Sequence, residues 1–273
     1  MGLRAKLGLP ETHFLFPFTS PGSFALARSY ALDEHRKEHK LAPGDLAYKV
    51  VDVNGVRLYL VIFAMAHMKG VAVAWQNPGI GISIRLAESL LPHLGGLTEV
   101  ACDAAGEDPP ATSYLAEGEA HGKLRERITG LLKRAAIDED KIRATVDDVF
   151  LYNSGMAAIY YLANVLLAYR PAAVGVLGSI FHNTLHHFEE KSPHGYQHFP
   201  GSGEAGLDAL EAWLDEDKKK EGRGLSFLLV EFPSNPLIAS ADLKRLKSLV
   251  RRSPFFLAQT LSLSAYSFRL DSL

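Results

Sequence analysis

Apolar residues in the second half of the chain recur in two patterns that alternate along the sequence. Short apolar runs of strand length are followed by longer segments whose apolar residues have helical spacing. The runs predict strands at residues 149–152, 173–177, 226–231 and 254–258. The longer segments predict helices at residues 156–169, 183–191, 206–219 and 241–252. This order indicates an α/β fold, with a mainly parallel sheet and helices on both faces. Ser240 is the predicted N-cap of the last helix.

The first half of the chain has a different pattern, which predicts an α+β region. Asn54-Gly55 separates two apolar runs, a strong signal for a β-hairpin over residues 48–66. Helices are predicted at residues 23–40, 83–91 and 117–136. Turn-forming residues are concentrated at 95–110. We therefore predict an N-terminal α+β region over residues 1–110, a parallel α/β domain over residues 111–260 and a divergent tail over residues 261–273.

The composition of the 273-residue chain narrows the class of function. A net charge of −2 and scattered Lys and Arg residues provide no basic surface for nucleic acid. The single cysteine, Cys102, cannot form a disulfide or a thiolate zinc site within one chain. The most apolar stretch, residues 58–74, contains His67 and Lys69 and is too short to span a bilayer. The N-terminus lacks the apolar core of a signal peptide. We expect a cytoplasmic protein that binds neither nucleic acid nor membranes.

The turn before the predicted helix at residues 156–169 is the first candidate site. Asn153-Ser154-Gly155 joins a short apolar run directly to this helix. Such an arrangement directs backbone N–H groups and the positive end of the helix dipole at an anion. A phosphate-bearing ligand is therefore one interpretation, and an ordinary turn between a strand and a helix is the other.

Histidine residues gather in one short segment, at positions 182, 186, 187, 194 and 198. His182 and His186 are four residues apart and would share a helix face, as in a pair of metal ligands. However, no Glu follows the first His as in the H-E-x-x-H motif, and Ser192-Pro193 breaks the segment. The pattern therefore favours solvated or hydrogen-bonded histidines over a metal site.

The sequence VEFPSNPL at residues 230–237 is the second candidate site. It ends an apolar strand with two prolines that bracket Ser234 and Asn235. Parallel α/β folds bind ligands at the carboxyl ends of their strands, where Asn235 would present an amide group. The same pattern also suits a simple turn.

Four stretches of the chain, taken in order, resemble the pyridoxal-phosphate-dependent transsulfuration family, and in particular the fungal-type cystathionine γ-synthases. These stretches are LYNSGMAAI (151–159), SIFHNTLHHF (179–188), VEFPSNPLIASADLKRL (230–246) and SPFFLAQT (253–260). Residues 1–146 are similar only to the longer fungal forms, and less specifically. The resemblance implies an incomplete fold-type-I large domain, with pyridoxal 5′-phosphate as the cofactor.

The resemblance also implies roles for individual residues. Gly155 and Met156 match the residues whose backbone N–H groups hold the cofactor phosphate, and Ser154 matches the turn residue before them. Phe181 falls where the family has a tyrosine that stacks on the cofactor ring, so it keeps the aromatic face and loses the hydroxyl. Asn235 matches the asparagine that hydrogen-bonds the pyridine 3-oxygen.

One further assignment and one departure follow from the same comparison of motifs. Arg85 is assigned as a phosphate-binding arginine given by a neighbouring subunit, although the family's Tyr-x-Arg pattern is absent. The acidic partner of the pyridine nitrogen falls at Ala258 or beside it at Gln259, and neither residue can fill that role.

The family's Schiff-base lysine has no counterpart in the stretches that carry the resemblance. Lys244 and Lys247 follow Asn235, but both lie in a predicted helix and are expected to be solvated. We therefore assign no catalytic residue and expect no covalent attachment of the cofactor. We also expect the chain to be C-terminally truncated.

The resemblance implies a reaction class for the full-length family. Its members join an activated homoserine ester to cysteine by γ-replacement in methionine biosynthesis, and β- and γ-lyases of the family use the same motifs. For the chain as given, the alternative is a non-catalytic remnant of the fold that binds phosphate ligands or pairs with a full-length paralogue. Homo-oligomers and an amino-acid substrate are the other partners that the family implies.

Overall fold

The computed structural model describes residues 2–113, 117–234, 237–253, 255–261 and 264–268. The chain divides into two compact units, Met1–Gly118 and Glu119–Leu273. No helix in the described part of the chain is both long enough and apolar enough to cross a membrane.

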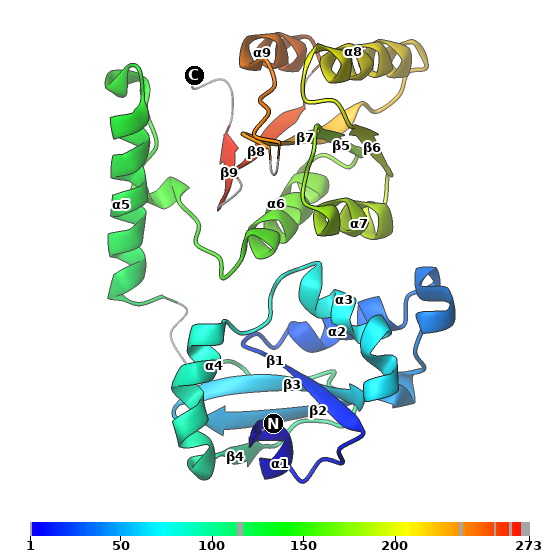
Figure 1. The fold of residues 1–273 in the computed structure, drawn as a ribbon, viewed down its shortest axis with the longest axis vertical. Helices are drawn as coiled ribbons and strands as arrows, with labels where there is room; N and C mark the ends of the chain where they lie inside the picture. The colour runs from blue at the N-terminus through cyan, green and yellow to red at the C-terminus, as the bar shows by residue number, and fades with distance from the viewer. Residues whose placement is uncertain (1, 114–116, 235–236, 254, 262–263, 269–273) are drawn as a thin grey trace. The chain divides into compact units, whose positions relative to one another are not determined.

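The first unit is built on an antiparallel sheet. Its described residues form four strands in the spatial order β1-β3-β2-β4 (Figure 1). The strands are β1 (His13–Phe18), β2 (Leu46–Val53), β3 (Val56–Ala64) and β4 (Thr98–Val100). The α-helices are α1 (Gly2–Lys6), α2 (Ser23–Ala31), α3 (Met68–Gln76) and α4 (Ile84–Leu90), with short 3-10 turns η1 (Glu34–His39), η2 (Pro43–Asp45), η3 (Met65–His67) and η4 (Leu91–Gly96) between them. The predicted hairpin is confirmed, because β2 and β3 pair across Asn54-Gly55, whose φ angles of 49° and 77° suit a tight two-residue turn.

Apolar side chains cover both faces of this first sheet. One buried cluster joins α2 and α3 to the sheet and includes Phe24, Tyr30 and Tyr59. The other joins α4 to the opposite face and includes Leu60 and Leu90. Alternate residues of the central strand β3 therefore contribute to two separate cores.

The second unit is a parallel α/β layer structure, as the alternating pattern predicted. Its described residues form a sheet of five strands in the order β6-β5-β7-β8-β9, parallel except for the last pair. The strands are β5 (Ala173–Leu177), β6 (Tyr196–Phe199), β7 (Leu225–Glu231), β8 (Phe256–Leu261) and β9 (Ser264–Phe268). The α-helices are α5 (Glu119–Ala135), α6 (Gly155–Tyr169), α7 (His182–Lys191), α8 (Glu204–Lys219) and α9 (Leu243–Arg252), with 3-10 turns η5 (Glu139–Lys141) and η6 (Val146–Asp148).

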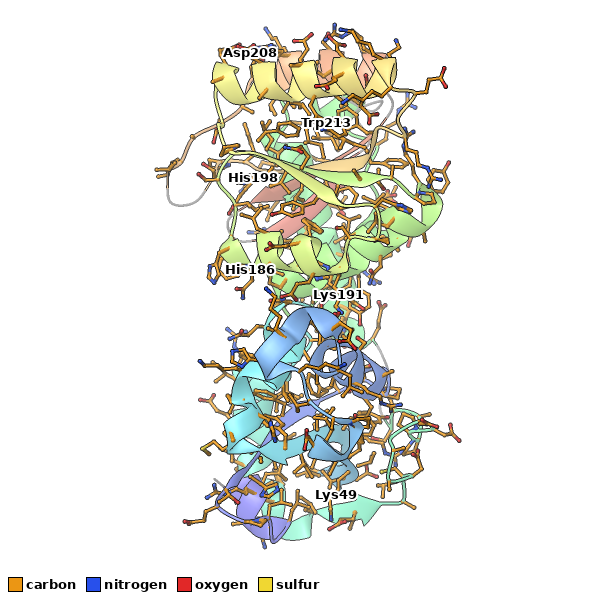
Figure 2. The ribbon with its side chains drawn as sticks, turned by 90° about the vertical axis from the view of Figure 1, so that its right-hand side faces the viewer. Lys49, His186, Lys191, His198, Asp208 and Trp213 are labelled. Atoms are coloured by element: carbon orange, nitrogen blue, oxygen red, sulfur yellow. The ribbon has the colours of Figure 1, made fainter. Side chains whose placement is uncertain are left out.

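Helices cover both faces of the second sheet (Figure 1). On one face, α6 and α7 pack through a cluster that includes Met156, Phe188 and Phe227. On the other, α8 and α9 pack through a cluster that includes Leu210 and Leu246. In Figure 2, Asp208 lies on the outer side of α8 and Trp213 on the side that faces the sheet.

The predicted strand at residues 149–152 is wrong. These residues follow η6 and lead directly into α6 without pairing with a strand. The carbonyl of Val149 accepts a hydrogen bond from Arg125 Nε of α5 at 2.9 Å, and Phe150 is 70% exposed. An apolar run becomes a strand only where a neighbouring strand can pair with it, and here a side chain takes one of its acceptors.

The predicted helix at residues 23–40 is correct only in its first half. The α-helix α2 ends at Ala31, and Lys37, with φ of 50°, interrupts the 3-10 segment that follows. The backbone N–H of Leu41 donates to the carbonyl of Ala31 at 2.9 Å, so the chain has turned back by this point. The polar sequence after Ala31 offers no apolar face that would extend α2 over the core.

Three smaller differences concern strands and a cap. The sequence pattern did not predict β6, an edge strand whose sequence YQHF has polar residues at its centre. It also did not predict β9, which lies in the tail at residues 261–273. The predicted N-cap Ser240 is wrong, because α9 begins after Asp242. The carboxylate of Asp242 accepts hydrogen bonds from Lys244 N at 2.8 Å and Arg245 N at 3.2 Å.

This correction provides a paired test of α9. Asp242→Ala is expected to lower the free energy of unfolding by about 1 kcal/mol, because two N–H groups of the first turn lose their acceptor. Ser240→Ala, two residues earlier, is expected to change it by less than about 0.5 kcal/mol. Chemical denaturation of both variants measures the difference. Equal effects of the two substitutions would contradict the assigned cap.

Candidate functional site

The first turn of α6 lies at the carboxyl edge, which we define as the edge of the second sheet where β5 and β7 end at Leu177 and Glu231. Two contacts at the other end of α6 establish this. The ring of Tyr169 lies 5.6 Å from that of Phe256, at the start of β8. Ser226 Oγ, at the start of β7, donates to the carbonyl of Leu166 at 3.2 Å. Since α6 runs antiparallel to these strands, its N-terminus lies where they end.

Ser154, Gly155 and Met156 form the start of α6. Ser154 is the N-cap, and its Oγ accepts a hydrogen bond from Ala157 N at 3.0 Å. As the first two residues of the helix, Gly155 and Met156 have N–H groups without an acceptor inside the helix. A Cβ at Gly155 would meet no atom within 4 Å, so the backbone here is open to close approach. The predicted turn is therefore a helix N-terminus with two available donors, preceded by a loop rather than a strand.

A chain of contacts connects this helix start to the first turn of α7. The hydroxyl of the buried Thr184 donates to Met156 Sδ at 3.4 Å. The backbone N–H of Thr184 donates to the carbonyl of Phe181 at 2.9 Å. Phe181 precedes α7 and is 49% exposed, with its ring centroid 4.6 Å from that of His182. The structure thus brings Phe181 to the same edge as the start of α6.

Glu231 is the last residue of β7 and is buried at the carboxyl edge. The backbone N–H of Phe181 lies beside its carboxyl group and favours the charged form. Burial raises the pKa of Glu231, and the Phe181 N–H offsets part of this shift. Together with Ser154, Gly155, Met156, Phe181 and Thr184, this residue forms what we call the edge site.

The loop between β5 and α7 is fixed at its first residue, Gly178. Its N–H donates to Phe199 O at 2.7 Å, and its carbonyl accepts from His198 Nε2 at 2.9 Å. Gly178 has φ of 82°, and a Cβ there would lie 2.7 Å from Ser202 Oγ, so no other residue fits without a shift. These contacts hold the loop that carries Phe181.

The histidine segment is divided between the surface and the interior. Figure 2 shows His186 and Lys191 on α7 and His198 in the sheet above it. His186 is exposed and lies 3.5 Å from Glu189, and its ring is 6.2 Å from that of His182. No group of three or more metal-ligating side chains forms among the described residues.

His187, by contrast, is buried between α6 and α7. Its ring lies 5.5 Å from the ring of Tyr160. Burial lowers the pKa of His187 to about 4, and the charge of Lys191 adds to this effect. His187 is therefore neutral at physiological pH and helps to position α7 beneath the sheet.

Asn235 lies outside the described residues. The other sequence-predicted residues are not among the contacts described for this edge. Arg85 is an exposed residue of α4 and belongs to the first unit. Lys244 lies on α9, which covers the opposite face of the sheet. Ala258 is buried in the α6–α7 face of β8, so the position predicted for an acidic partner has no polar group. Of Gln259 only the backbone is described.

Thr184 and Glu231 were quoted in sequence motifs but were not assigned a role. A single acidic residue that directly follows the apolar run at residues 227–230 was a usable signal for Glu231, because buried carboxylates are rare without a partner. Nothing in the local pattern distinguished Thr184 from other polar helix residues. Its burial results from the packing of α7 on α6.

Comparisons with known proteins add relatives to this geometry. No family model matches the sequence, and no solved structure matches it either. An alanine racemase from Aspergillus violaceofuscus is 32% identical over 202 residues, which cover 70% of this chain and 34% of that protein. A cystathionine gamma-synthase-like enzyme from Amanita muscaria is 30% identical over 251 residues, 74% of this chain and 39% of that protein. Cystathionine gamma-synthase from Neurospora crassa is 30% identical over 158 residues, 50% of this chain and 25% of that protein.

The chain therefore spans less than two fifths of the length of these relatives, and the names of the relatives describe two different activities. The similarity indicates a common origin for the aligned segment and does not select one reaction.

The buried imidazole makes stability depend on pH. Between pH 6.5 and about 4 the unfolded chain binds a proton at His187 that the folded chain does not, so the free energy of unfolding falls as pH decreases. We expect a loss of up to about 3 kcal/mol from this residue over that range. His187→Gln should remove this part of the pH dependence, measured by urea denaturation at several pH values.

His186→Gln, at the exposed neighbouring position, is the matched control and should retain the pH dependence of the original chain. Opposite behaviour, with His186→Gln flattening the profile and His187→Gln preserving it, would contradict the assignment.

Proposed function

We propose that this chain is a cystathionine γ-synthase-like protein of the pyridoxal-phosphate-dependent transsulfuration type. Its second unit would be an incomplete fold-type-I large domain. The observation that carries the proposal is the edge site, where two available N–H groups at the start of α6 lie in one set of contacts with Phe181 and Glu231. The relatives support the same class, since one of the three is named cystathionine gamma-synthase and another cystathionine gamma-synthase-like enzyme.

The phosphate end of the cofactor fits the start of α6. The N–H groups of Gly155 and Met156 and the helix dipole both favour a dianionic group at this position. Ser154 has its Oγ engaged by Ala157 N, so it would hold the helix start in shape rather than bind the phosphate through that oxygen. The absence of a side chain at Gly155 leaves room for the ligand oxygens.

The ring end of the cofactor fits only in part. Phe181, half exposed at the carboxyl edge, offers an aromatic face for stacking. When bound, pyridoxal phosphate supplies an electron sink for reactions of amino acids, provided that the ring nitrogen is protonated. Ala258 offers no acid for this purpose. The chain's own described residues therefore suit the binding of the cofactor better than its activation.

The proposal extends to the reaction of the whole protein. That reaction would be γ-replacement, which joins an activated homoserine ester and cysteine in methionine biosynthesis. A second candidate is a non-catalytic role, in which the chain binds phosphate ligands through α6, and the observation that favours it is Ala258 at the acidic position. The two candidates share the same ligand contacts, so a binding experiment tests their common part.

Gly155→Ala tests the phosphate contact directly. In the ligand-free protein the added methyl group meets nothing within 4 Å, so the free energy of unfolding should stay the same or rise by up to about 1 kcal/mol. The methyl group would lie where the phosphate approaches the backbone. We expect the affinity for 4-deoxypyridoxine 5′-phosphate, a cofactor analogue without the aldehyde, to fall at least about tenfold by isothermal titration calorimetry.

Gly130→Ala in α5 is the matched control, because a Cβ there also meets nothing within 4 Å and Gly130 lies outside the edge site. It should leave the affinity unchanged. The analogue cannot react with surface lysines, so its binding reports on the non-covalent site alone. Equal affinities of the original chain and Gly155→Ala would rule out a phosphate at the start of α6.

A further inference from the structure

Glu231 has a buried oxygen without a hydrogen-bond partner. The residue is only 8% exposed, and its Oε2 finds no partner among the described residues. A buried carboxyl oxygen that lacks a partner destabilises the folded state, so its presence at the end of β7 needs an explanation.

The direction of this carboxyl group follows from the alternation along β7. Phe227 and Leu229 belong to the core under α6 and α7, whereas Leu228 and Val230 belong to the core under α8 and α9. Side chains alternate between the faces of a strand, so Glu231 points to the α6–α7 face. The position of Phe181 N–H beside this carboxyl group agrees with this direction. The unpaired oxygen therefore lies on the same face as the start of α6.

The strand register relates Glu231 to the position where an acid is missing. Leu229 of β7 pairs with Ala258 of β8, and Glu231 pairs with Thr260. Glu231 therefore lies on the strand next to β8, two residues beyond Leu229 toward the carboxyl edge. Its side chain is on the same face of the sheet as that of Ala258. Position 258 has no acidic side chain, but Glu231 places one on the same face of the sheet.

No charged group among the described residues neutralises Glu231. It takes part in none of their ion pairs, and the causes of its raised pKa are burial and, in the opposite direction, the Phe181 N–H. A carboxyl group in this situation can hydrogen-bond a ring nitrogen through its free oxygen, as the acceptor from a protonated nitrogen or, when it is itself protonated, as the donor to a neutral one. Its complement is therefore a nitrogen heterocycle such as a pyridine ring.

We propose that Glu231 contacts the ligand of the edge site through Oε2, forming a hydrogen bond to a nitrogen heterocycle whose phosphate is held at the start of α6. This inference rests on the proposed function, because it assumes that a phosphate-bearing ring occupies the edge site. It assigns the recognition of the ring, as opposed to the phosphate, to the end of β7.

Glu231→Gln separates this role from a purely structural one. Glutamine has the same shape and keeps a carbonyl oxygen that can face Phe181 N–H, so we expect the loop before α7 to keep its position. It replaces the free carboxyl oxygen by an amide NH₂, which titrates at no accessible pH. A residue that only supports the loop would tolerate this substitution without effect on any ligand.

The experiment compares two probes, 4-deoxypyridoxine 5′-phosphate and inorganic phosphate, by isothermal titration calorimetry on the full chain between pH 5.5 and 8. Glu231→Gln should weaken binding of the pyridine probe about tenfold and should leave binding of inorganic phosphate within about twofold. The melting temperature of the ligand-free variant should equal or exceed that of the original chain. Glu126→Gln, the same chemical change at an exposed position of α5, should alter neither affinity.

A measurement on the unaltered chain covers the case in which the variant does not fold. The ¹³C resonance of the Glu231 side-chain carboxyl should move on addition of the pyridine probe and stay in place on addition of inorganic phosphate. Unchanged binding of the pyridine probe by Glu231→Gln, or an unmoved carboxyl resonance, would overturn the inference and leave the proposed function intact. Failure of the original chain to bind the pyridine probe at all would overturn the proposed function and this inference with it.

Discussion

The burial of β7 is the constraint on which the second unit depends. All seven of its residues are buried, and parallel neighbours on both sides take its backbone hydrogen bonds. A strand in this position needs an apolar cover on each face, which α6 with α7 and α8 with α9 provide. A polar group that faces the interior can then appear only where the strand ends. Glu231 is in that position, and the carboxyl edge is where the proposed ligand contacts gather.

Helix α7 connects this edge to the interior through desolvated polar groups. The hydroxyl of Thr184 donates a hydrogen bond to the sulfur of Met156. His187 contacts the ring of Tyr160, and burial lowers its pKa, which favours the neutral imidazole. The loop that carries Phe181 is held at Gly178, which hydrogen-bonds His198 and Phe199 of β6, and Phe181 N–H lies beside Glu231. The exposed aromatic face at the edge is thus held by groups that water cannot easily reach.

The edge site separates two tasks that a phosphorylated heterocycle imposes on a protein. The start of α6 suits the phosphate, and it needs only backbone donors and a residue without a side chain. Recognition of the ring needs specific side chains, and on this face β8 has Ala258, whereas β7 has the buried Glu231 two residues nearer the carboxyl edge.

Hydrophobic periodicity by itself determined the hairpin, the helices of the second unit and its parallel strands β5, β7 and β8, because these elements bury regular apolar faces. The turn before α6 indicated Ser154, Gly155 and Met156 as candidate ligand contacts, and the resemblance to the transsulfuration family added Phe181. Only the tertiary structure decided that residues 149–152 are not a strand, because pairing depends on which acceptors neighbouring elements leave free. The same holds for Glu231: its sequence position shows an acid at the end of a strand, but burial and the unpaired oxygen arise from the packing of α6 and α7 on the sheet.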